Sequence, residues 1–256
     1  MKSDTPRDAK SPTAPHPILT RYYQHEGDRQ PFVTALFDGT ARHYDWVCAI
    51  GSLGSGQRYR RSALVRWGLR RGMKLLDVAA GTGLVAREAI PIVRDSGAVI
   101  GLDASASMLR EARRTLALPL VQGTAERLPF GDDHFDFLTM AYALRHMADL
   151  RTAFDECRRV LTPGGRLLIL EVSKPRSTLA LWGVRIYMQK VVPLLARVCT
   201  GSAETATLVK YYWDTIAECL PPDTILAALR SSGFDDVARH VVGGLFSEYV
   251  GSKPMR

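Results

Sequence analysis

The 256-residue sequence has few cysteines and no pattern among them. Cys48, Cys157, Cys199 and Cys219 form no CxxC pair and have no zinc-finger spacing, which indicates core or incidental thiols in a reducing compartment. The opening stretch MKSDTPRDAKSPTAPHP lacks the apolar segment of a signal peptide. No uninterrupted apolar run reaches the roughly 18 residues that a membrane span requires. These absences predict a cytoplasmic protein.

The composition argues against a disordered chain and leaves the choice of partner open. Hydrophobic residues make up 46% of the sequence, enough for one large core, and charged residues make up 23%, near the globular average. The formal net charge of +8 is compatible with nucleic acid, an anionic membrane surface or an anionic ligand. The Lys and Arg residues are scattered along the chain, which favours a solvated surface.

The chain divides into parts of different composition. Residues 1–31 hold Pro6, Pro12, Pro15 and Pro17 among serine, threonine and charged residues, which predicts a disordered N-terminal tail. Residues 32–256 are expected to form a single domain, which begins with a helical cap over 32–71 that is broken by the glycine-rich GSLGSG. Within this domain, the segment 176–222 is expected to form a lid on the substrate side.

From residue 73 onward, short β-like runs alternate with helix-like runs. The expected strands are KLLDVAA, AVIGLD, LPLVQGTA, FDFLTMAYAL and RLLILEVS, and the expected helices are LVAREAIPIVR, SASMLREARRTLA and DLRTAFDECRRVLT. This alternation predicts a parallel sheet between helices. Two further β-like runs flank Gly243-Gly244, a hairpin signal. The predicted fold is therefore α/β: a Rossmann-like seven-stranded, mostly parallel sheet with helices on both faces and a C-terminal antiparallel hairpin.

A glycine-rich turn follows the first of these strands. The stretch KLLDVAAGTGLVAREA places Gly81, Thr82 and Gly83 between a buried strand and a helix. Glycines at this point let a ligand approach the main chain, and the first turn of the helix offers free N–H groups. An ordinary structural turn would also use glycine, so this motif alone leaves both interpretations open.

The next strand ends in Asp103, about 20 residues beyond the glycines, at the spacing of an acid that binds the ribose of a nucleoside. Its alternative role is to cap the following helix, which Ser105 fills equally well. A nicotinamide dinucleotide and S-adenosylmethionine both carry such a ribose. The pattern from Asp77 through Ala79 to Gly83 lacks the first glycine of a dinucleotide turn, and its acid would repel a diphosphate. This favours S-adenosylmethionine.

These segments together carry a resemblance to a known family. LLDVAAGTG, VIGLDASASML, VQGTAERLPFGDDHFDFLTMAYALRH and RRVLTPGGRLLILEVSKP follow one another as in class I S-adenosylmethionine-dependent methyltransferases. The chain resembles more narrowly the UbiE-type family, the C-methyltransferases of ubiquinone and menaquinone biosynthesis. The narrower features are LRH, LEVSKP and SLGSGQRYRR, and the resemblance covers roughly residues 32–253.

The resemblance implies a set of cofactor-binding residues. They are Asp77, Ala79, Gly81, Thr82, Gly83, Asp103, Ala104, Met108, Thr124, Ala125, Glu126 and Ala141. The sequence departs from the family at three positions: Thr124 stands where asparagine is usual, Ala141 lacks an expected hydroxyl, and His146 replaces an asparagine. The implied cofactor is S-adenosyl-L-methionine, which leaves as S-adenosyl-L-homocysteine, and nothing in the sequence calls for a metal.

Three residues after the fourth strand are candidates for catalysis, because a phenol attacks through carbon only when it becomes phenolate-like. Arg145 is suited to hold the developing oxyanion, and His146 to accept a proton. Tyr142 completes this set, and His43 and Asp45 are further candidates. A salt bridge for Arg145 and a capping or hydrogen-bonding role for His146 are the alternatives.

Two apolar segments point to the acceptor. The run Leu179–Cys199 is interrupted by three basic residues, which suits an amphipathic lid, a helix resting on a membrane surface, or an ordinary packed helix. Tyr211, Tyr212 and Trp213 follow one another in a helix-like stretch, and their spacing cannot place all three on one inward face. One or two of them are candidates to wall a ring-shaped substrate.

The sequence therefore favours C-methylation of a small lipophilic aromatic acceptor, a quinol or phenol of the ubiquinone or menaquinone type. The alternatives are methylation at O, N or C of another small metabolite and, as a minor one, a cofactor-binding protein without catalysis. Nucleic acid is not expected as a substrate, because the fourth strand lacks the Asp/Asn-Pro-Pro-aromatic signature of amino-directed enzymes. Peripheral membrane contact and a homodimer are both left open.

Overall fold

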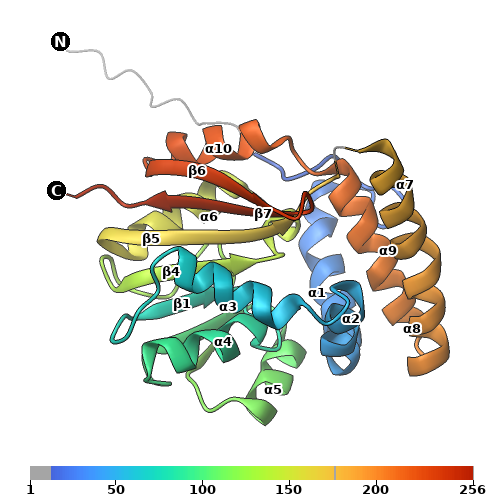
Figure 1. Cartoon of the computed structure of the whole chain (residues 1–256), viewed down its shortest axis with the longest axis horizontal. Coiled ribbons are helices and arrows are strands. Elements are labelled where there is room, and N and C mark those ends of the chain that lie inside the picture. The colour runs from blue at the N-terminus through green and yellow to red at the C-terminus, as the bar shows by residue number, and fades with distance from the viewer. Residues whose placement is uncertain (1–12, 176, 256) are drawn as a thin grey trace.

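The computed structural model describes residues 13–175 and 177–255, and this part of the chain contains a seven-stranded sheet (Figure 1). The strands are β1 (Leu75–Val78), β2 (Val99–Asp103), β3 (Leu120–Gln122), β4 (Phe135–Ala141), β5 (Leu161–Val172), β6 (Asp235–Val242) and β7 (Phe246–Ser252). Their order is β3-β2-β1-β4-β5-β7-β6. The first five are parallel, and β7 runs antiparallel to both β5 and β6. The predicted fold class and the C-terminal hairpin are confirmed.

The strand order reverses between β1 and β4, which are neighbours in the sheet although two strands intervene in the sequence. Ligands of open α/β sheets bind beyond the carboxyl ends of the strands at such a point. The fold therefore directs attention to the loops that follow β1, β2 and β4.

Ten α-helices are assigned in the described residues. They are α1 (Arg29–Thr40), α2 (Tyr44–Gly51), α3 (Gly56–Arg66), α4 (Leu84–Val93), α5 (Ala106–Thr115), α6 (Leu150–Val160), α7 (Thr178–Ile186), α8 (Val192–Thr200), α9 (Ala203–Glu218) and α10 (Pro222–Ser231). The glycine-rich break falls between α2 and α3, as expected. A single π-helical turn over Tyr187–Val191 joins α7 to α8.

Alternate side chains of the strands build two separate cores, one on each face of the sheet. Leu76 and Val78 belong to the core that includes Phe154 of α6 and Leu229 of α10. Leu75 belongs to the opposite core with residues of α3 and α4. This period-two alternation, with helices over both faces, is what fixes the register of β1.

Helix α5 packs beside β2 and β3, and helices α1, α2 and α7 to α9 lie together at the end of the sheet where the parallel strands finish (Figure 1). They have small cores of their own, in which Tyr211 of α9 packs against Phe32 of α1 at 5.4 Å between ring centroids. This group of helices covers the edge at which a ligand is expected.

Residues 13–31 correct the prediction of a disordered tail. His16, Tyr23 and Arg29 are each less than 5% exposed, and the Arg29 guanidinium donates to the His16 carbonyl at 3.0 Å. The proline-rich composition was misleading because aromatic residues in the same stretch pack against α1 and α9. The part of the predicted tail over residues 1–12 lies outside the described residues.

The segment Thr178–Thr200 is a helix of 23 residues with a mean hydropathy of 1.2 over its most apolar 18-residue window. By length and composition it is the one candidate membrane span among the described residues, and only 17% of that window is buried. Leu179, Trp182, Leu194 and Val198 are each more than 60% exposed, while Val192 is buried against Val47 and Val209. The helix is therefore packed along one side, and its exposed surface carries large apolar side chains together with Arg185, Lys190 and Arg197.

Candidate active site

The turn between β1 and α4 has an unusual backbone. Ala79, Gly81 and Gly83 all have positive φ angles, of 55°, 58° and 82°. Gly83 is the N-cap of α4, and a Cβ there would collide with Leu116. At Gly81 a Cβ would face the Tyr44 ring at 3.8 Å. Positive φ angles of this kind favour glycine and hold the main chain of the turn open toward a ligand.

Asp103 at the end of β2 is held next to this turn. Its Oδ2 accepts a hydrogen bond from the Gly81 N–H at 2.7 Å, and its Oδ1 accepts one from the Ser105 N–H at 2.8 Å. Ser105 caps α5, because its hydroxyl accepts from the Met108 N–H at 3.1 Å. Burial raises the pKa of Asp103, and the N–H donors oppose that rise. The capping alternative is thus assigned to Ser105, and Asp103 faces the cavity.

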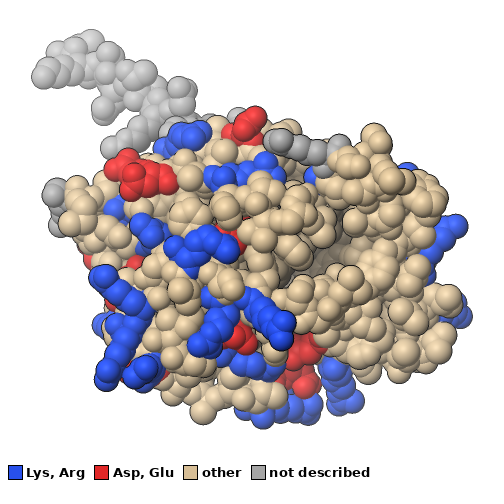
Figure 2. All heavy atoms as spheres, in the orientation of Figure 1, with Lys and Arg blue, Asp and Glu red and all other residues tan. Residues whose placement is uncertain are grey.

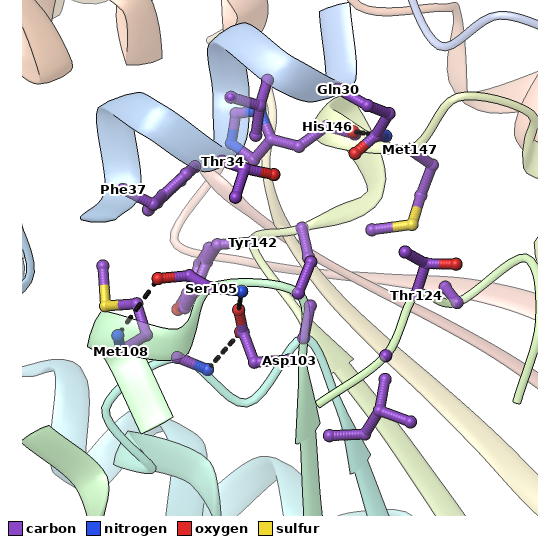
Figure 3. A pocket seen from close by; sticks show the side chains of 18 of the residues that line it. Gln30, Thr34, Phe37, Asp103, Ser105, Met108, Thr124, Tyr142, His146 and Met147 are labelled. Atoms are coloured by element: carbon purple, nitrogen blue, oxygen red, sulfur yellow. Dashed lines mark hydrogen bonds between the residues drawn. The ribbon is translucent and has the colours of Figure 1, made fainter. Parts of the chain in front are cut away.

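Helix α1 forms the roof of this cavity, as Figure 3 shows from close by. Gln30, Thr34 and Phe37 line it from above. Asp38, one residue further, ties the roof to the start of α5: it accepts from the Ser105 hydroxyl at 2.5 Å and from the Ser107 N–H at 3.0 Å. These residues of α1 were not predicted from the sequence. The only signal in the sequence was the helical cap expected over residues 32–71, which does not reveal which side chains point inward.

The space between these loops and α1, measured out to its open mouth, is about 680 Å³. Of the predicted cofactor and catalytic residues, the lining includes Ala79, Gly81, Asp103, Ala104, Met108, Thr124, Ala125, Glu126, Ala141, Tyr142 and His146. The loops after β1, β2, β3 and β4 thus bring together residues that are up to 67 positions apart in the sequence. The prediction that they share one site agrees with this geometry.

Three predicted cofactor residues lie outside the lining. Gly83 is the N-cap already described. Thr82 is 3% exposed, and its hydroxyl donates to Asp45 of α2. Asp77 is 1% exposed and accepts from the Thr139 hydroxyl at 2.7 Å through Oδ1, whereas its Oδ2 has no partner among the described residues. Burial raises the pKa of Asp77 to about 7.

Arg145 also lies away from this cavity, in an ion pair. Its Nε donates to Glu171 at 2.7 Å, and both side chains are 3% exposed. A second donor, Nη1, bonds to the Thr215 hydroxyl at 2.8 Å. The salt-bridge alternative therefore accounts for the guanidinium, although Arg145 also lines a second cavity.

His146 is buried in aromatic surroundings. Its ring lies 5.3 Å from that of Phe37 and 5.4 Å from that of Tyr211, and neither ring nitrogen has a hydrogen-bond partner in the described structure. Burial lowers the pKa of His146 well below its usual value, and the nearby Arg145, His16 and Arg29 charges lower it further. The imidazole is therefore neutral near pH 7, which makes it a poor acceptor of a proton and a good hydrogen-bonding group.

A second, apolar cavity adjoins the first and has an empty volume of about 1,090 Å³. Its walls come from α2, α3, α7 to α9 and the β6–β7 turn: Val47, Cys48, Arg60, Val184, Tyr187, Met188, Val192, Val209, Tyr212, Ile216, Leu245 and Phe246 are among them. Tyr44 and Tyr142 line both cavities. In Figure 2 this face is hollowed between the ends of the strands and these helices, where few charged side chains gather.

The two shared tyrosines are neutral groups at the junction. Burial raises the pKa of both Tyr44 and Tyr142 above the ordinary phenol value. Tyr142 has a φ of 59°, a strained conformation that persists where the surrounding structure enforces it, often at functional sites. A hydrogen-bonding cavity and an apolar cavity that meet at two neutral phenols are suited to bringing a polar nucleoside and a lipophilic ring together.

Residues 24–253 match the model of the ubiE/COQ5 methyltransferase family. The chain is 35% identical over 237 residues to the ubiquinone/menaquinone biosynthesis C-methyltransferase UbiE of Pseudomonas paraeruginosa, in a match that covers 90% of this chain and 91% of that enzyme. The enzyme of the same name from Francisella philomiragia is 32% identical over 234 residues, with 88% and 92% covered.

Solved structures share the fold at lower identity. A SAM-dependent methyltransferase from Aquifex aeolicus is 18% identical with a TM-score of 0.56, and 76% of this chain and 89% of that chain are covered. Phosphoethanolamine N-methyltransferase 2 of Haemonchus contortus, solved with S-adenosyl-L-methionine, is 18% identical with a TM-score of 0.60 and coverages of 85% and 57%. The chain belongs to the ubiE/COQ5 methyltransferase family and is an S-adenosylmethionine-dependent methyltransferase.

Proposed function

We propose that the protein methylates a ring carbon of a lipophilic quinol or phenol of the ubiquinone or menaquinone type. The observation that carries this proposal is the apolar cavity that joins the cavity beside Asp103 at Tyr44 and Tyr142. The relatives from Pseudomonas paraeruginosa and Francisella philomiragia are ubiquinone/menaquinone biosynthesis C-methyltransferases, which supports the same class of acceptor.

The first cavity suits S-adenosylmethionine in several respects. Asp103 offers its remaining carboxylate lone pairs to ribose hydroxyls, and Ala125 and Met108 offer apolar contacts to a purine. When bound, the cofactor supplies a methyl group activated by its sulfonium.

The second cavity suits the acceptor because its walls are mostly aliphatic and aromatic. Such walls exclude water and hold a ring in one orientation, and proximity of this kind is worth several kcal/mol, about 7–11 in favourable systems. The acceptor carbon gains the methyl group, and the ring hydrogen it carried leaves as a proton to solvent. The Tyr44 and Tyr142 hydroxyls, which are neutral, serve as hydrogen-bond groups rather than as bases.

The segment 176–222 is proposed to control access of the acceptor from a membrane surface. Within it, α7 and α8 line the apolar cavity with one side and expose Leu179, Trp182, Leu194 and Val198 with the other. Arg185, Lys190 and Arg197 are exposed on the same helix, as on helices that lie at an anionic interface. A lipophilic acceptor could then pass from lipid to the cavity with little exposure to water.

The experiment that tests the function is transfer of a labelled methyl group to a set of acceptors, with the product identified by mass spectrometry. Demethylmenaquinol and benzoquinol analogues that lack the ring methyl group are expected to gain a methyl group on carbon, and chain-shortened analogues to react more slowly. The departures at Thr124, Ala141 and His146 are compatible with another small metabolite as the acceptor. Methylation of a lipid extract at oxygen or nitrogen, with neither quinol converted, would favour that alternative.

A further inference from the structure

We propose that Arg60 binds the ring oxygen of the acceptor and stabilises it as an anion, which makes Arg60, rather than Arg145, the cation of this active site. The proposal rests on the proposed function, because it assigns the oxygen of a phenol or quinol to one residue. It concerns a side chain on α3 that neither the glycine turn nor the motifs after the fourth strand include.

Arg60 is buried at the junction of the two cavities. Its side chain is 6% exposed, lines the apolar cavity, and holds its guanidinium carbon 5.4 Å from the centroid of the Tyr142 ring. Gly56, at the start of α3, leaves room for the guanidinium because it has no side chain. A Cβ at this position would lie 2.8 Å from Arg60 Nη1, which is too close. The guanidinium is therefore placed against one of the two residues that both cavities share.

The charge of Arg60 has no ion-pair partner. Across residues 13–175 and 177–255, no hydrogen bond or salt bridge engages its guanidinium, whereas Arg145 pairs with Glu171 and the nearby Arg66 pairs with Glu248. A buried cation without a partner costs free energy, and its donors remain available for a ligand. The anionic partner is then expected to arrive with the acceptor.

The surroundings of Arg60 favour an ionised oxygen. None of the described residues that line the apolar cavity is Asp or Glu. The titratable groups that sense the Arg60 charge are Cys48 of α2, Tyr142 after β4 and Asp77 of β1. Burial raises the pKa of the Cys48 thiol to about 11 and also raises the pKa of Tyr142, so both are neutral. Asp77, with a pKa of about 7, offsets the charge only in part.

The chemistry follows from this placement. The acceptor O–H proton passes to water, and the resulting oxyanion accepts charge-assisted hydrogen bonds from the planar guanidinium. Electron density on the ring carbon beside that oxygen rises, so this carbon forms the new bond to the methyl group. The ring C–H proton then leaves to water, and the aromatic ring is restored with the oxygen protonated again on release.

The test uses a phenol whose ionisation is visible, 4-nitrophenol with an alkyl chain beside the hydroxyl, bound to the full-length protein saturated with S-adenosylhomocysteine. Absorbance against pH gives the pKa of the bound phenol. In the wild-type protein this pKa is expected to fall below its value in water by about one unit or more, a tenfold shift toward the anion. A bound phenol that titrates at or above its value in water would overturn the proposal without any variant.

Two variants and a matched control locate the effect. Arg60→Met is expected to abolish the shift and to lower kcat/KM for ring methylation roughly 10²-fold, with unchanged binding of S-adenosylhomocysteine. Arg60→Lys, which keeps the charge but loses the planar fork, is expected to show an intermediate shift. Arg61→Met, an exposed position on the same helix, is expected to behave as wild type.

The outcomes separate this proposal from the proposed function. If quinols are methylated and Arg60→Met titrates as wild type, Arg60 has no such role and the function stands. If no quinol is methylated but the nitrophenol is bound as its anion only when Arg60 is present, the proposed quinol methylation is contradicted and the proposed role of Arg60 is supported. Should Arg60→Met fail to bind S-adenosylhomocysteine, the wild-type and Arg60→Lys titrations decide.

Discussion

At the scale of single residues, Asp77 couples folding to pH. Its pKa is about 7 in the folded protein against an ordinary value of 3.8, because burial disfavours the charged form. Between pH 3.8 and about pH 7, the folded protein therefore keeps a proton on Asp77 that the unfolded chain has released. This proton stabilises the folded protein fully below the unfolded pKa of 3.8. The free energy of unfolding then falls by about 1.4 kcal/mol for each pH unit, and the contribution is lost as the pH rises through the folded pKa of about 7.

Asp77→Asn is therefore expected to flatten the pH dependence of the free energy of unfolding of the ligand-free protein. Urea unfolding at about pH 5 and about pH 8 measures it, and the variant should be the more stable of the two proteins at the higher pH. Asp155→Asn, at an exposed position, is the control and should leave the slope as it is. An unchanged slope in Asp77→Asn would show that this carboxyl is ionised in the folded state.

The Arg145–Glu171 pair is expected to be structural. Arg145→Met leaves a buried carboxylate unpaired and should lower the free energy of unfolding by about 3–5 kcal/mol. The double variant Arg145→Met with Glu171→Leu should recover much of that loss, which a double-mutant cycle measures by urea unfolding. Full stability of the single variant together with lost methyl transfer would instead place Arg145 on the acceptor.

These residues show what sequence could and could not predict about the site. Asp103 and the glycine turn were predictable because their spacing is fixed by the strand–turn–helix geometry of the fold. The partners of Thr82 and Arg145 were not, because Asp45 and Glu171 lie far away in the sequence. Arg60 was not predicted either, because it is one of six arginines over residues 58–71, and such a group is expected to be solvated. Only the structure shows that Arg60 is buried.

At the scale of elements, the helix over Thr178–Thr200 is the one with a testable surface. Leu194 and Val198 are one turn apart and 63% and 74% exposed. Leu194→Glu and Val198→Glu together are expected to abolish cosedimentation with vesicles that contain phosphatidylglycerol, because the apolar contact is replaced by like charge. The thermal midpoint should not change.

Val65→Glu is the matched control for this surface. Val65 is 57% exposed on α3, away from the helix, and its substitution should leave vesicle binding intact. Equal binding of all three proteins would show that the apolar face of the helix does not meet lipid.

At the scale of helices and strands, the sequence predicted the elements of the sheet but not how the N-terminal segment and α9 pack. The alternation of strands and helices after residue 73 gave every strand of the sheet, since period-two and helical patterns are local. The ordered packing of residues 13–31 depends on Tyr211 and Asp214, which belong to a distant helix. The consecutive aromatics of α9 are likewise all largely buried, because other helices pack on more than one of its sides.

At the scale of the whole molecule, the cofactor is expected to join the roof helix to the sheet and so to stabilise the fold. S-Adenosylhomocysteine at about 100 times its Kd should add about 2.7 kcal/mol and raise the thermal midpoint by roughly 5–10 °C. In Asp103→Asn this increase should be lost, while the midpoint without ligand falls by only a few degrees, because one acceptor oxygen remains.

Asp155→Asn serves again as the control and should show the full increase with ligand. If the thermal midpoint of ligand-free Asp103→Asn falls by as much as the increase that it fails to show with S-adenosylhomocysteine, the carboxylate is mainly structural. Scanning calorimetry with and without ligand measures both quantities on one sample.

The packing of the N-terminal segment on α9 also bears on how the chain is made. The Tyr22 hydroxyl donates to Asp214, 192 positions later. While a ribosome extends the chain, residues 13–40 emerge early and must wait for α9 to be synthesised, with their aromatic side chains uncovered. The roof of the active site is therefore completed only after the five parallel strands β1 to β5 have been synthesised, and the nascent chain cannot hold a ligand beneath α1 before α9 is made.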